Sequence, residues 1–551
     1  MLKIALAQVN FQVGNFESNT QKIIDRIQTA KANNTGLIVF SELSVCGYPA
    51  RDFLTYPHFI QQCYKSISLI AEQCQGIAAI VGAPSPSKVI AGKNIYNSAY
   101  LLSNGKVQHI INKSLLPTYD VFDEYRYFES NTNDFSCIEI NGVKIAVTVC
   151  EDLWDVDMDK MYKQNPMDEL VKQSPDVMIN IAASPFNYEH REDRLRVFKL
   201  NCEKYNLPLL YVNQTGAQTE LIFDGGSLAL DNKGEIIQEL NYFEEQVAYF
   251  EFENAVIKHL QPNNSSTHST IKIARIHDAL VLGIKDYFAK LGFTKAILGL
   301  SGGIDSALVA VLAVRALGSA NVKVLLLPSQ YSSEHSINDA LALANTLNIE
   351  YEIVNITQAN TAVEATLANA FSGLAFNVTE ENIQARLRGL LLMAHSNKFG
   401  YVLLNTTNKS EAAVGYGTLY GDMCGGLAVL GDVYKTECYE LSNYINKDAV
   451  VIPTNSIEKP PSAELRPNQK DSDSLPDYDV LDTILRAYIE HCNSPEDIIA
   501  KGHNAALVNR VLGMVNINEF KRFQMAPVLR VSPKAFGMGR RMPLEGKYKY
   551  V

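Results

Sequence analysis

Several features that would place this chain in a specialised class are scarce or missing. The nine cysteines form no CxxC pair, which disfavours a disulfide framework or a zinc site and favours free thiols in a reducing cytoplasm. No apolar run reaches bilayer length, and the N-terminal residues lack the pattern of an export signal, so we expect neither membrane insertion nor secretion. Lys and Arg number 49 against 60 Asp and Glu, and the net charge of −11 argues against non-specific nucleic-acid binding.

What the sequence does contain is the material of an ordinary globular protein with more than one domain. It has 551 residues, of which 47% are hydrophobic and 20% charged. Short β-branched segments alternate with helical patterns over residues 1–255, a polar stretch at 256–270 has the composition of a linker, and the alternation resumes over 271–551. In the second part this alternation predicts parallel βαβ units and an open, doubly wound sheet, whose ligands bind at the carboxyl ends of the strands.

Three residues with chemically useful side chains stand at the ends of predicted strands in the first part. Cys150 ends "KIAVTVC", Glu42 follows "GLIVF", and Lys113 follows "HIIN". Each has an ordinary explanation when taken alone, as a buried small side chain, a loop carboxylate and a surface amine. Together they supply what a thiolate nucleophile needs, namely a base to take the proton and a cation nearby.

The segments that carry these residues resemble the nitrilase superfamily, whose signature is a Glu–Lys–Cys triad at three strand ends. The resemblance rests on "FSELSVCGYP", "NKSLLPTYDVFDEYRYF" and "CEDLW", and it implies a four-layer αββα sandwich. It also implies that Glu42 acts as base, Lys113 stabilises the oxyanion, and Cys150 forms a thioester. Glutamine-hydrolysing members further place three side chains near the substrate, and the matching positions here are Tyr119, Ser184 and Arg191.

A different kind of loop opens the second part, in the stretch "ILGLSGGIDSALV" (297–309). A strand runs into small residues and then a helix, so that backbone N–H groups can form a nest for phosphate. The lysine of an ordinary P-loop is missing, and Asp305 stands in the first turn of the helix. Capping of the helix would explain Asp305, but it does not explain three small residues in succession before it.

This loop resembles the PP-loop of the N-type ATP pyrophosphatases. The blocks "TEENIQARLRG" and "LLNTTNKSEAAVGYGTLYGDM" further resemble the synthetase domain of the NAD⁺ synthetase family, with a Rossmann-like sheet. The resemblance implies an ATP site formed by Gly299, Leu300, Ser301, Gly302, Gly303, Ile304, Asp305, Ser306 and Thr406. It implies a deamido-NAD⁺ site formed by Asn382, Glu411, Tyr416, Gly417, Thr418, Leu419 and Lys521. Asp305 and Glu411 are the implied ligands of Mg²⁺.

Together, the two resemblances imply a glutamine-dependent ligase in which the first domain supplies ammonia to the second. The nicotinate carboxylate of deamido-NAD⁺ would be adenylated by ATP with release of pyrophosphate, and ammonia would displace AMP. Because free ammonia is mostly protonated at neutral pH, we expect an internal path between the sites, and we expect a homo-oligomer to help enclose it. The irregular, proline-rich stretch 454–479 is long enough to form a lid over a site.

Three alternatives remain open at this stage. A PP-loop amidotransferase that makes GMP or asparagine would carry a different glutaminase domain and would lack "ENIQAR" and "NKSE". A tRNA-modifying enzyme is disfavoured by the acidic charge and by the absence of a recognisable RNA-binding module. A sensor that binds a dinucleotide without turnover would have no need of Glu42, Lys113, Cys150 and Asp305.

Overall fold

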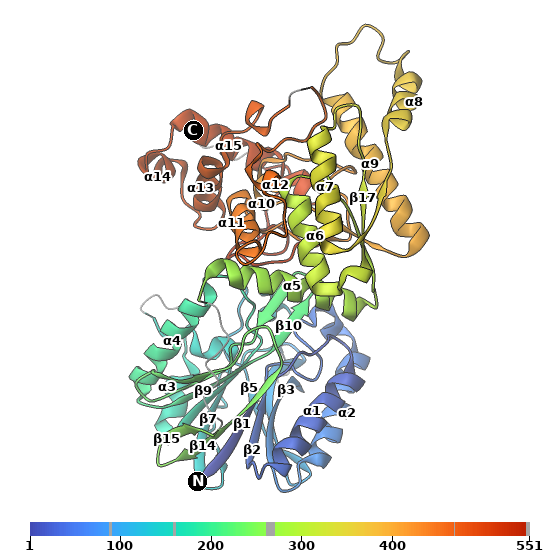
Figure 1. Ribbon diagram of the computed structural model, residues 1–551. Helices are drawn as coiled ribbons and strands as arrows, with labels where there is room; N and C mark the ends of the chain where they lie inside the picture. Colours follow the sequence, from blue (N-terminus) through green and yellow to red (C-terminus); the bar gives the residue numbers. More distant parts are fainter. Residues whose placement is uncertain (88–90, 158–160, 261–269, 468, 547–551) are drawn as a thin grey trace. The chain divides into compact units, whose positions relative to one another are not determined.

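The computed structural model describes residues 1–87, 91–157, 161–260, 270–467 and 469–546 (Figure 1). The chain divides into two compact units, Met1–Ser269 and Thr270–Val551, each with its own sheets and hydrophobic core. Most of the expected linker, residues 261–269, lies outside the described residues. Within the described ranges, none of the helices combines the length and apolar character that a transmembrane segment requires.

The first unit contains fifteen strands among its described residues, arranged in two large sheets and a hairpin. The strands are β1 (Leu2–Gln8), β2 (Leu37–Phe40), β3 (Ala78–Pro86), β4 (Ile95–Ser103), β5 (Lys106–Asn112), β6 (Ile138–Ile140), β7 (Val143–Val149), β8 (Val177–Ala182), β9 (Leu209–Asn213), β10 (Thr215–Gln218), β11 (Leu221–Asp224), β12 (Leu228–Leu230), β13 (Ile236–Glu239), β14 (Gln246–Glu253) and β15 (Val256–His259). The helices are α1 (Phe16–Ala32), α2 (Pro57–Gln73), α3 (Pro166–Leu170) and α4 (His190–Tyr205), with short 3₁₀ turns η1 (Arg51–Thr55), η2 (Glu124–Arg126), η3 (Cys150–Leu153) and η4 (Val171–Gln173).

The two large sheets pack face to face, as the alternation of side chains along β1 shows. Leu2, Ile4 and Leu6 point into a core shared with β7, β8 and β9 of the other sheet. Ala5 and Ala7 point the opposite way, into a core shared with α1 and α2. One face of a strand therefore packs on the second sheet and the other on helices. The expected αββα sandwich is confirmed, with strand orders β15-β14-β1-β2-β3-β4-β5 and β13-β12-β9-β8-β7-β6.

The expected start of the linker needs a correction. Residues 256–259 form β15, which pairs antiparallel with β14 from Phe250 opposite His259 to Glu253 opposite Val256. The first sheet therefore continues past residue 255. A chain reversal at Asn254 and Ala255, both with positive φ, brings the strand back onto its neighbour, and this residue pair is not a typical hairpin turn.

The second unit has one five-stranded sheet among its described residues. Its strands are β16 (Ala296–Gly299), β17 (Val322–Leu326), β18 (Glu350–Ile353), β19 (Val402–Asn405) and β20 (Leu427–Ala428). Its helices are α5 (Lys272–Leu291), α6 (Ile304–Leu317), α7 (Glu334–Leu347), α8 (Thr357–Leu367), α9 (Val378–Phe399), α10 (Lys409–Val414), α11 (Lys435–Ile445), α12 (Thr454–Glu458), α13 (Tyr478–Ile489), α14 (Pro495–Ala500), α15 (Ala505–Ile517) and α16 (Glu519–Arg522), with 3₁₀ turns η5 (Ser319–Asn321) and η6 (Asp471–Asp473).

All four strand pairs in this sheet are parallel, which confirms the doubly wound architecture. The strand order is β18-β17-β16-β19-β20, so the chain leaves β16 toward one edge and later returns to its other side. Such a reversal of direction opens a crevice at the carboxyl ends of the strands, where ligands of these sheets bind. The loop "SGGIDS" follows β16 at that position.

Candidate active sites

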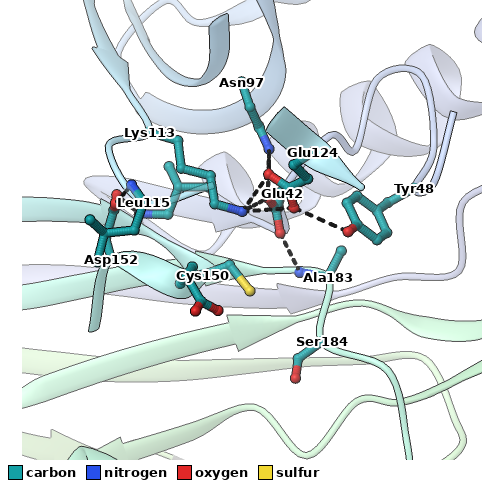
Figure 2. A network of polar contacts seen from close by, with 12 residues as sticks. Glu42, Tyr48, Asn97, Lys113, Leu115, Glu124, Cys150, Asp152, Ala183 and Ser184 are labelled. Atoms are coloured by element: carbon teal, nitrogen blue, oxygen red, sulfur yellow. Dashed lines mark hydrogen bonds and ion pairs between the residues drawn. The ribbon is translucent and has the colours of Figure 1, made fainter. Parts of the chain in front are cut away.

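The three predicted residues of the first unit each follow a strand, and the structure brings them together (Figure 2). Glu42 lies just beyond β2, Lys113 directly follows β5, and Cys150 directly follows β7. Cys150 has a φ of +45°, a left-handed conformation that is unfavourable for a residue with a side chain. The strand therefore ends abruptly at the nucleophile, and in Figure 2 the sulfur lies near the Lys113–Glu42 pair and Ser184.

Lys113 is fully buried between two carboxylates. Its Nζ lies 2.8 Å from Glu42 Oε1 and 2.8 Å from Glu124 Oε2. Glu42 also accepts hydrogen bonds from Asn97 Nδ2 at 2.6 Å and from the backbone N–H of Ala183 at 3.0 Å. The base is thus held in one orientation by three donors, which leaves little freedom for its carboxylate to turn.

The charges of this group are strongly coupled. Burial, together with the negative charge of Glu42, raises the pKa of the Cys150 thiol well above its usual value. Burial opposes ionisation of Lys113, but the carboxylates of Glu124 and Glu42 outweigh it and raise the pKa of the amine. Burial also raises the pKa of Glu124 to about 7. Cys150 is therefore a protonated thiol at rest, and a base must take its proton when it reacts.

The predicted glutamine-binding residues are engaged in different ways. The hydroxyl of Tyr119 donates to the carboxylate of Glu151 at 3.0 Å, and Tyr162 donates to the same group. Ser184 Oγ lies 2.7 Å from His190 Nε2, and the His190 ring stacks on Trp154 at 4.9 Å between centroids. Ser184 is therefore held by the first residue of α4.

Arg191, in contrast, makes its described contacts away from Ser184. Its Nε and Nη2 bind the two oxygens of Glu239 on β13 at 3.0 and 2.7 Å. This bidentate ion pair occupies the fork that would otherwise bind a carboxylate of a ligand. Ser184 is contacted by the neighbouring residue, His190, which the resemblance did not single out.

In the second unit, the loop after β16 forms one wall of a cavity. Gly302 adopts a φ of +80°, and a Cβ at this position would overlap the backbone of Ser336. Ser301 and Ser306 brace the loop, with Ser301 N donating to Ser306 Oγ at 3.2 Å. Of the predicted ATP and deamido-NAD⁺ residues, those that line the cavity are Gly299, Leu300, Ser301, Gly303, Ile304, Asp305, Ser306, Thr406, Glu411 and Tyr416.

Carboxylates and lysines line this cavity, and Lys435 lies among the carboxylates. Lys435, the first residue of α11, contacts Asp305 Oδ2 and lies 3.7 Å from Glu411 Oε1. Burial and the charge of Asp305 raise the pKa of Glu411 to about 8. Asp471 also lines the cavity and accepts hydrogen bonds from the hydroxyls of Tyr416 and Tyr478. Neither Lys435 nor Asp471 was among the residues predicted from the sequence.

Mg²⁺ prefers hard oxygen ligands and takes few of them from the protein when phosphates are present. No group of three or more His, Cys, Asp or Glu suited to a metal occurs in the part of the chain that the structure describes. Two carboxylates, Asp305 and Glu411, line the same cavity as the phosphate-type loop. This donor set fits a magnesium ion whose remaining ligands are phosphate oxygens and water.

The remaining predicted residues form a second group, whose members do not line the cavity. Thr418 Oγ1 donates to Asn382 Oδ1 at 2.6 Å, linking "YGTL" to α9. Lys521 Nζ donates to the carbonyls of Gly415 and Gly417 at 2.7 and 2.8 Å. Leu419 accepts through its carbonyl from Arg386. These contacts link "YGTL" to α9 and to Lys521 on α16.

Part of the irregular stretch 454–479 lines the cavity. Residues 459–465 belong to its lining. Glu464 attaches this segment to the start of α7, because its carboxylate accepts from Ser333 Oγ and Ser336 Oγ at 2.8 Å each. Residue 468, which the expected lid includes, lies outside the described residues.

Two family models match the chain, and together they cover most of it. Residues 3–260 match the carbon-nitrogen hydrolase model, and residues 276–525 match the NAD synthase model. The sandwich with its Glu–Lys–Cys group and the parallel sheet with its phosphate-type loop therefore define a two-part ligase, which combines a carbon–nitrogen hydrolase with an ATP-using synthetase.

Relatives that are similar over the full length identify the family. The chain is 44% identical to the glutamine-dependent NAD(+) synthetase of Synechocystis sp. (99% of this chain, 98% of the relative) and 41% identical to that of Acinetobacter baylyi (98% of each). A solved structure of glutamine-dependent NAD+ synthetase from Acinetobacter baumannii in complex with ADP is 38% identical, covers 98% of both chains and has a TM-score of 0.78. The chain belongs to the family of glutamine-dependent NAD(+) synthetases and is an enzyme of the ligase type.

Proposed function

We propose that this chain converts deamido-NAD⁺ to NAD⁺ with ATP and with ammonia released from glutamine at Glu42, Lys113 and Cys150. The observation that carries the proposal is the fully buried Lys113–Glu42 ion pair beside a thiol at the end of β7. A buried charge pair is costly to maintain and is not needed to stabilise a sheet end. Because the Lys113–Glu42 pair lies beside the Cys150 thiol, we infer that it takes part in catalysis.

At the glutaminase site, Glu42 takes the proton of Cys150 as the sulfur attacks the side-chain amide of glutamine. Lys113 stabilises the oxyanion of the tetrahedral intermediate together with the backbone N–H after Cys150. Glu42 returns the proton to the leaving nitrogen, so ammonia departs and a thioester remains. Water activated by Glu42 then hydrolyses the thioester to glutamate and the free thiol.

The glutamine molecule itself would be held by Tyr119, Glu151, Ser184 and His190. Glu151 is a buried carboxylate that accepts from two tyrosine hydroxyls, and it suits the α-ammonium group of an amino acid. Ser184 is supported by His190 on the opposite side of the thiol in Figure 2. Arg191 is not given a contact with glutamine here, because its guanidinium group pairs with Glu239.

At the synthetase site, the nicotinate carboxylate of deamido-NAD⁺ attacks the α-phosphorus of ATP and expels pyrophosphate. The product is an acyl adenylate, which ammonia attacks to give NAD⁺ and AMP. The backbone N–H groups of the loop after β16 bind phosphate oxygens, and Lys435 supplies a cation. Mg²⁺ held by Asp305 and Glu411 would neutralise phosphate charge. Asn382, Thr418 and Lys521 would contact deamido-NAD⁺.

The test is a reconstituted reaction with ATP, Mg²⁺, deamido-NAD⁺ and either glutamine or an ammonium salt. We expect NAD⁺ and AMP in equal amounts from both nitrogen sources, with one glutamate for each NAD⁺ in the first. Absence of NAD⁺ with both sources would contradict the proposal. Measurement of the molar mass in solution tests the expected homo-oligomer.

A further inference from the structure

Asp152, two residues after the nucleophile, connects the two strand ends that carry Lys113 and Cys150. Its Oδ1 accepts from the backbone N–H groups of Ser114 at 3.0 Å and Leu115 at 2.9 Å. Its Oδ2 accepts from the N–H of Val149 at 3.0 Å. Ser114 follows Lys113 directly and Val149 precedes Cys150 directly, so one buried carboxylate ties together both catalytic segments.

Capping of the short turn η3 accounts for only one of these three bonds. The bond from Val149 closes that turn, but Ser114 and Leu115 lie 38 and 37 residues away in sequence. Asp152 makes no ion pair in the ranges that the structure describes, and its charge is met by N–H dipoles. Burial raises its pKa to about 6 although these bonds oppose the shift. Burial of a charge without an ion-pair partner is costly. All three hydrogen bonds of the Asp152 carboxylate are made to backbone N–H groups, so they hold the backbone in position.

The conformation of Cys150 explains why such a connection is needed. A left-handed φ in a non-glycine residue persists only where the surroundings hold it. The Asp152–Val149 bond fixes the residue before the strained position, and the bonds to Ser114 and Leu115 fix the backbone after Lys113. In Figure 2, Asp152 lies beside Leu115, while Lys113 and Cys150 extend from the same region toward Glu42.

We propose that Asp152 is a positioning residue of the glutaminase, which sets the Cys150 thiol relative to the Lys113 ammonium. The inference rests on the proposed function of the Glu42–Lys113–Cys150 site. Asp152 contacts neither the thiol nor the amine, so it acts through the backbone that carries them. Displacement of a nucleophile by about 1 Å can cost about a hundredfold in rate.

The decisive variant is Asp152→Asn, which keeps the size but replaces one acceptor oxygen with a donor. We expect kcat for glutamine hydrolysis to fall about a hundredfold. The KM for glutamine and the rate of ammonium-driven NAD⁺ formation should both stay within about twofold, because the substrate contacts and the second unit are intact. The rate at which iodoacetamide alkylates Cys150 should also differ from that of wild type, since this rate depends directly on the position and environment of the thiol.

Asp155→Asn is the matched control, because Asp155 is a buried acid of the same segment that accepts from the N–H of Met161. It should hydrolyse glutamine at the wild-type rate. If Asp152→Asn does not fold, Asp152→Glu keeps the charge but moves it by one methylene, and kcat should fall at least about tenfold.

Wild-type kcat in a folded Asp152→Asn or Asp152→Glu protein would overturn the inference, as would an equal loss of ammonium-driven synthesis. Cys150→Ala separates this result from failure of the proposed function. If Cys150→Ala still hydrolyses glutamine, the assignment of the site is wrong. If Cys150→Ala is inactive while Asp152→Asn is fully active, only the role of Asp152 is wrong.

Discussion

The ammonium group of Lys435 lies against the carboxylate of Asp305, although 130 residues separate them in the sequence. The phosphate-type loop lacks a lysine of its own and carries Asp305 where the negative charge would oppose its ligand. Lys435 reaches the same cavity from the start of α11 and also lies 3.7 Å from Glu411. A cation from a distant segment therefore balances the carboxylates that face the cavity.

Replacement of Lys435 by Met should abolish NAD⁺ formation from either nitrogen source and leave glutamine hydrolysis intact. Loss of one partner from a buried ion pair should also lower the free energy of unfolding of the second unit by about 3–5 kcal/mol. Denaturant unfolding and parallel assays of glutamate and NAD⁺ measure both effects. Lys272→Met is the control, because Lys272 pairs with Glu437 on the same helix but does not line the cavity. A wild-type rate of NAD⁺ formation in Lys435→Met would contradict the assignment of Lys435 to the synthetase site.

Cys150→Ala should separate the two activities. Without the sulfur no thioester forms, so glutamine-driven synthesis should fall by at least about a thousandfold. Ammonium-driven synthesis should stay within about twofold of wild type, because the second unit is unchanged. NAD⁺ measured with each nitrogen source gives the comparison, and Cys137→Ala, which removes a half-buried thiol elsewhere in the unit, is the control. An equal loss with both sources would contradict the assignment of glutamine hydrolysis to this thiol.

His190 and Arg191 should differ in their effect on glutamine binding. His190→Ala removes the support of Ser184, and we expect KM for glutamine to rise about tenfold, the equivalent of one hydrogen bond. Arg191→Ala breaks the Glu239 pair and should lower the melting temperature while KM changes little. Steady-state kinetics and thermal unfolding of the two variants test the difference. A larger increase in KM for Arg191→Ala than for His190→Ala would show that Arg191 belongs to the glutamine site.

Glu124 should give the first unit a stability that depends on pH. Its pKa is about 7 in the folded protein, against 4.5 as the ordinary value, so the folded state holds a proton that the unfolded state has lost between these pH values. The contribution of Glu124 to the free energy of unfolding is fully present below about pH 4.5 and is lost as the pH rises through about 7. Glu124→Gln lacks this titration, so its stability relative to wild type should rise over the same interval.

Calorimetric unfolding of wild type and Glu124→Gln from pH 4.5 to 8 measures this difference. Glu139→Gln, a change at an exposed position on β6, should show no such trend. A difference between Glu124→Gln and wild type that is constant with pH would contradict the raised pKa.

Gly302 and Gly303 should respond differently to a methyl group. A Cβ at Gly302 overlaps backbone of Ser336, and the φ of +80° disfavours any side chain, so Gly302→Ala should abolish NAD⁺ formation. A Cβ at Gly303 meets only Ser301 Oγ at 3.3 Å, so Gly303→Ala should retain more activity. Glutamate release, which belongs to the first unit, should continue in both. NAD⁺ formation by Gly302→Ala at the level of Gly303→Ala would argue against a fixed loop conformation.

The sequence by itself predicted the position of both sites along the chain and, through its βαβ alternation, the doubly wound sheet, whereas the αββα sandwich followed from the resemblance of its motifs to the nitrilase superfamily. A short continuous apolar run, as in "KIALAQ", indicates a strand that is buried on both faces, and small residues between a strand and a helix indicate a phosphate-type loop. Both signals are local, because side-chain period and backbone freedom are properties of a few neighbouring residues. Glu42, Lys113 and Cys150 were predicted because each follows a predicted strand and because their segments together resemble the nitrilase superfamily.

Only the tertiary structure decided which distant side chains complete the sites. Lys435 meets Asp305, Glu124 meets Lys113, and His190 meets Ser184. These pairings depend on how strands are ordered in a sheet and on which face a helix turns inward, and no local pattern encodes either. The boundary at residue 255 failed for a different reason: β14 and β15 form a local hairpin through Asn254 and Ala255, and this residue pair is not a typical hairpin turn. Burial then makes these contacts matter, since a charge removed from water must find its partner inside the fold.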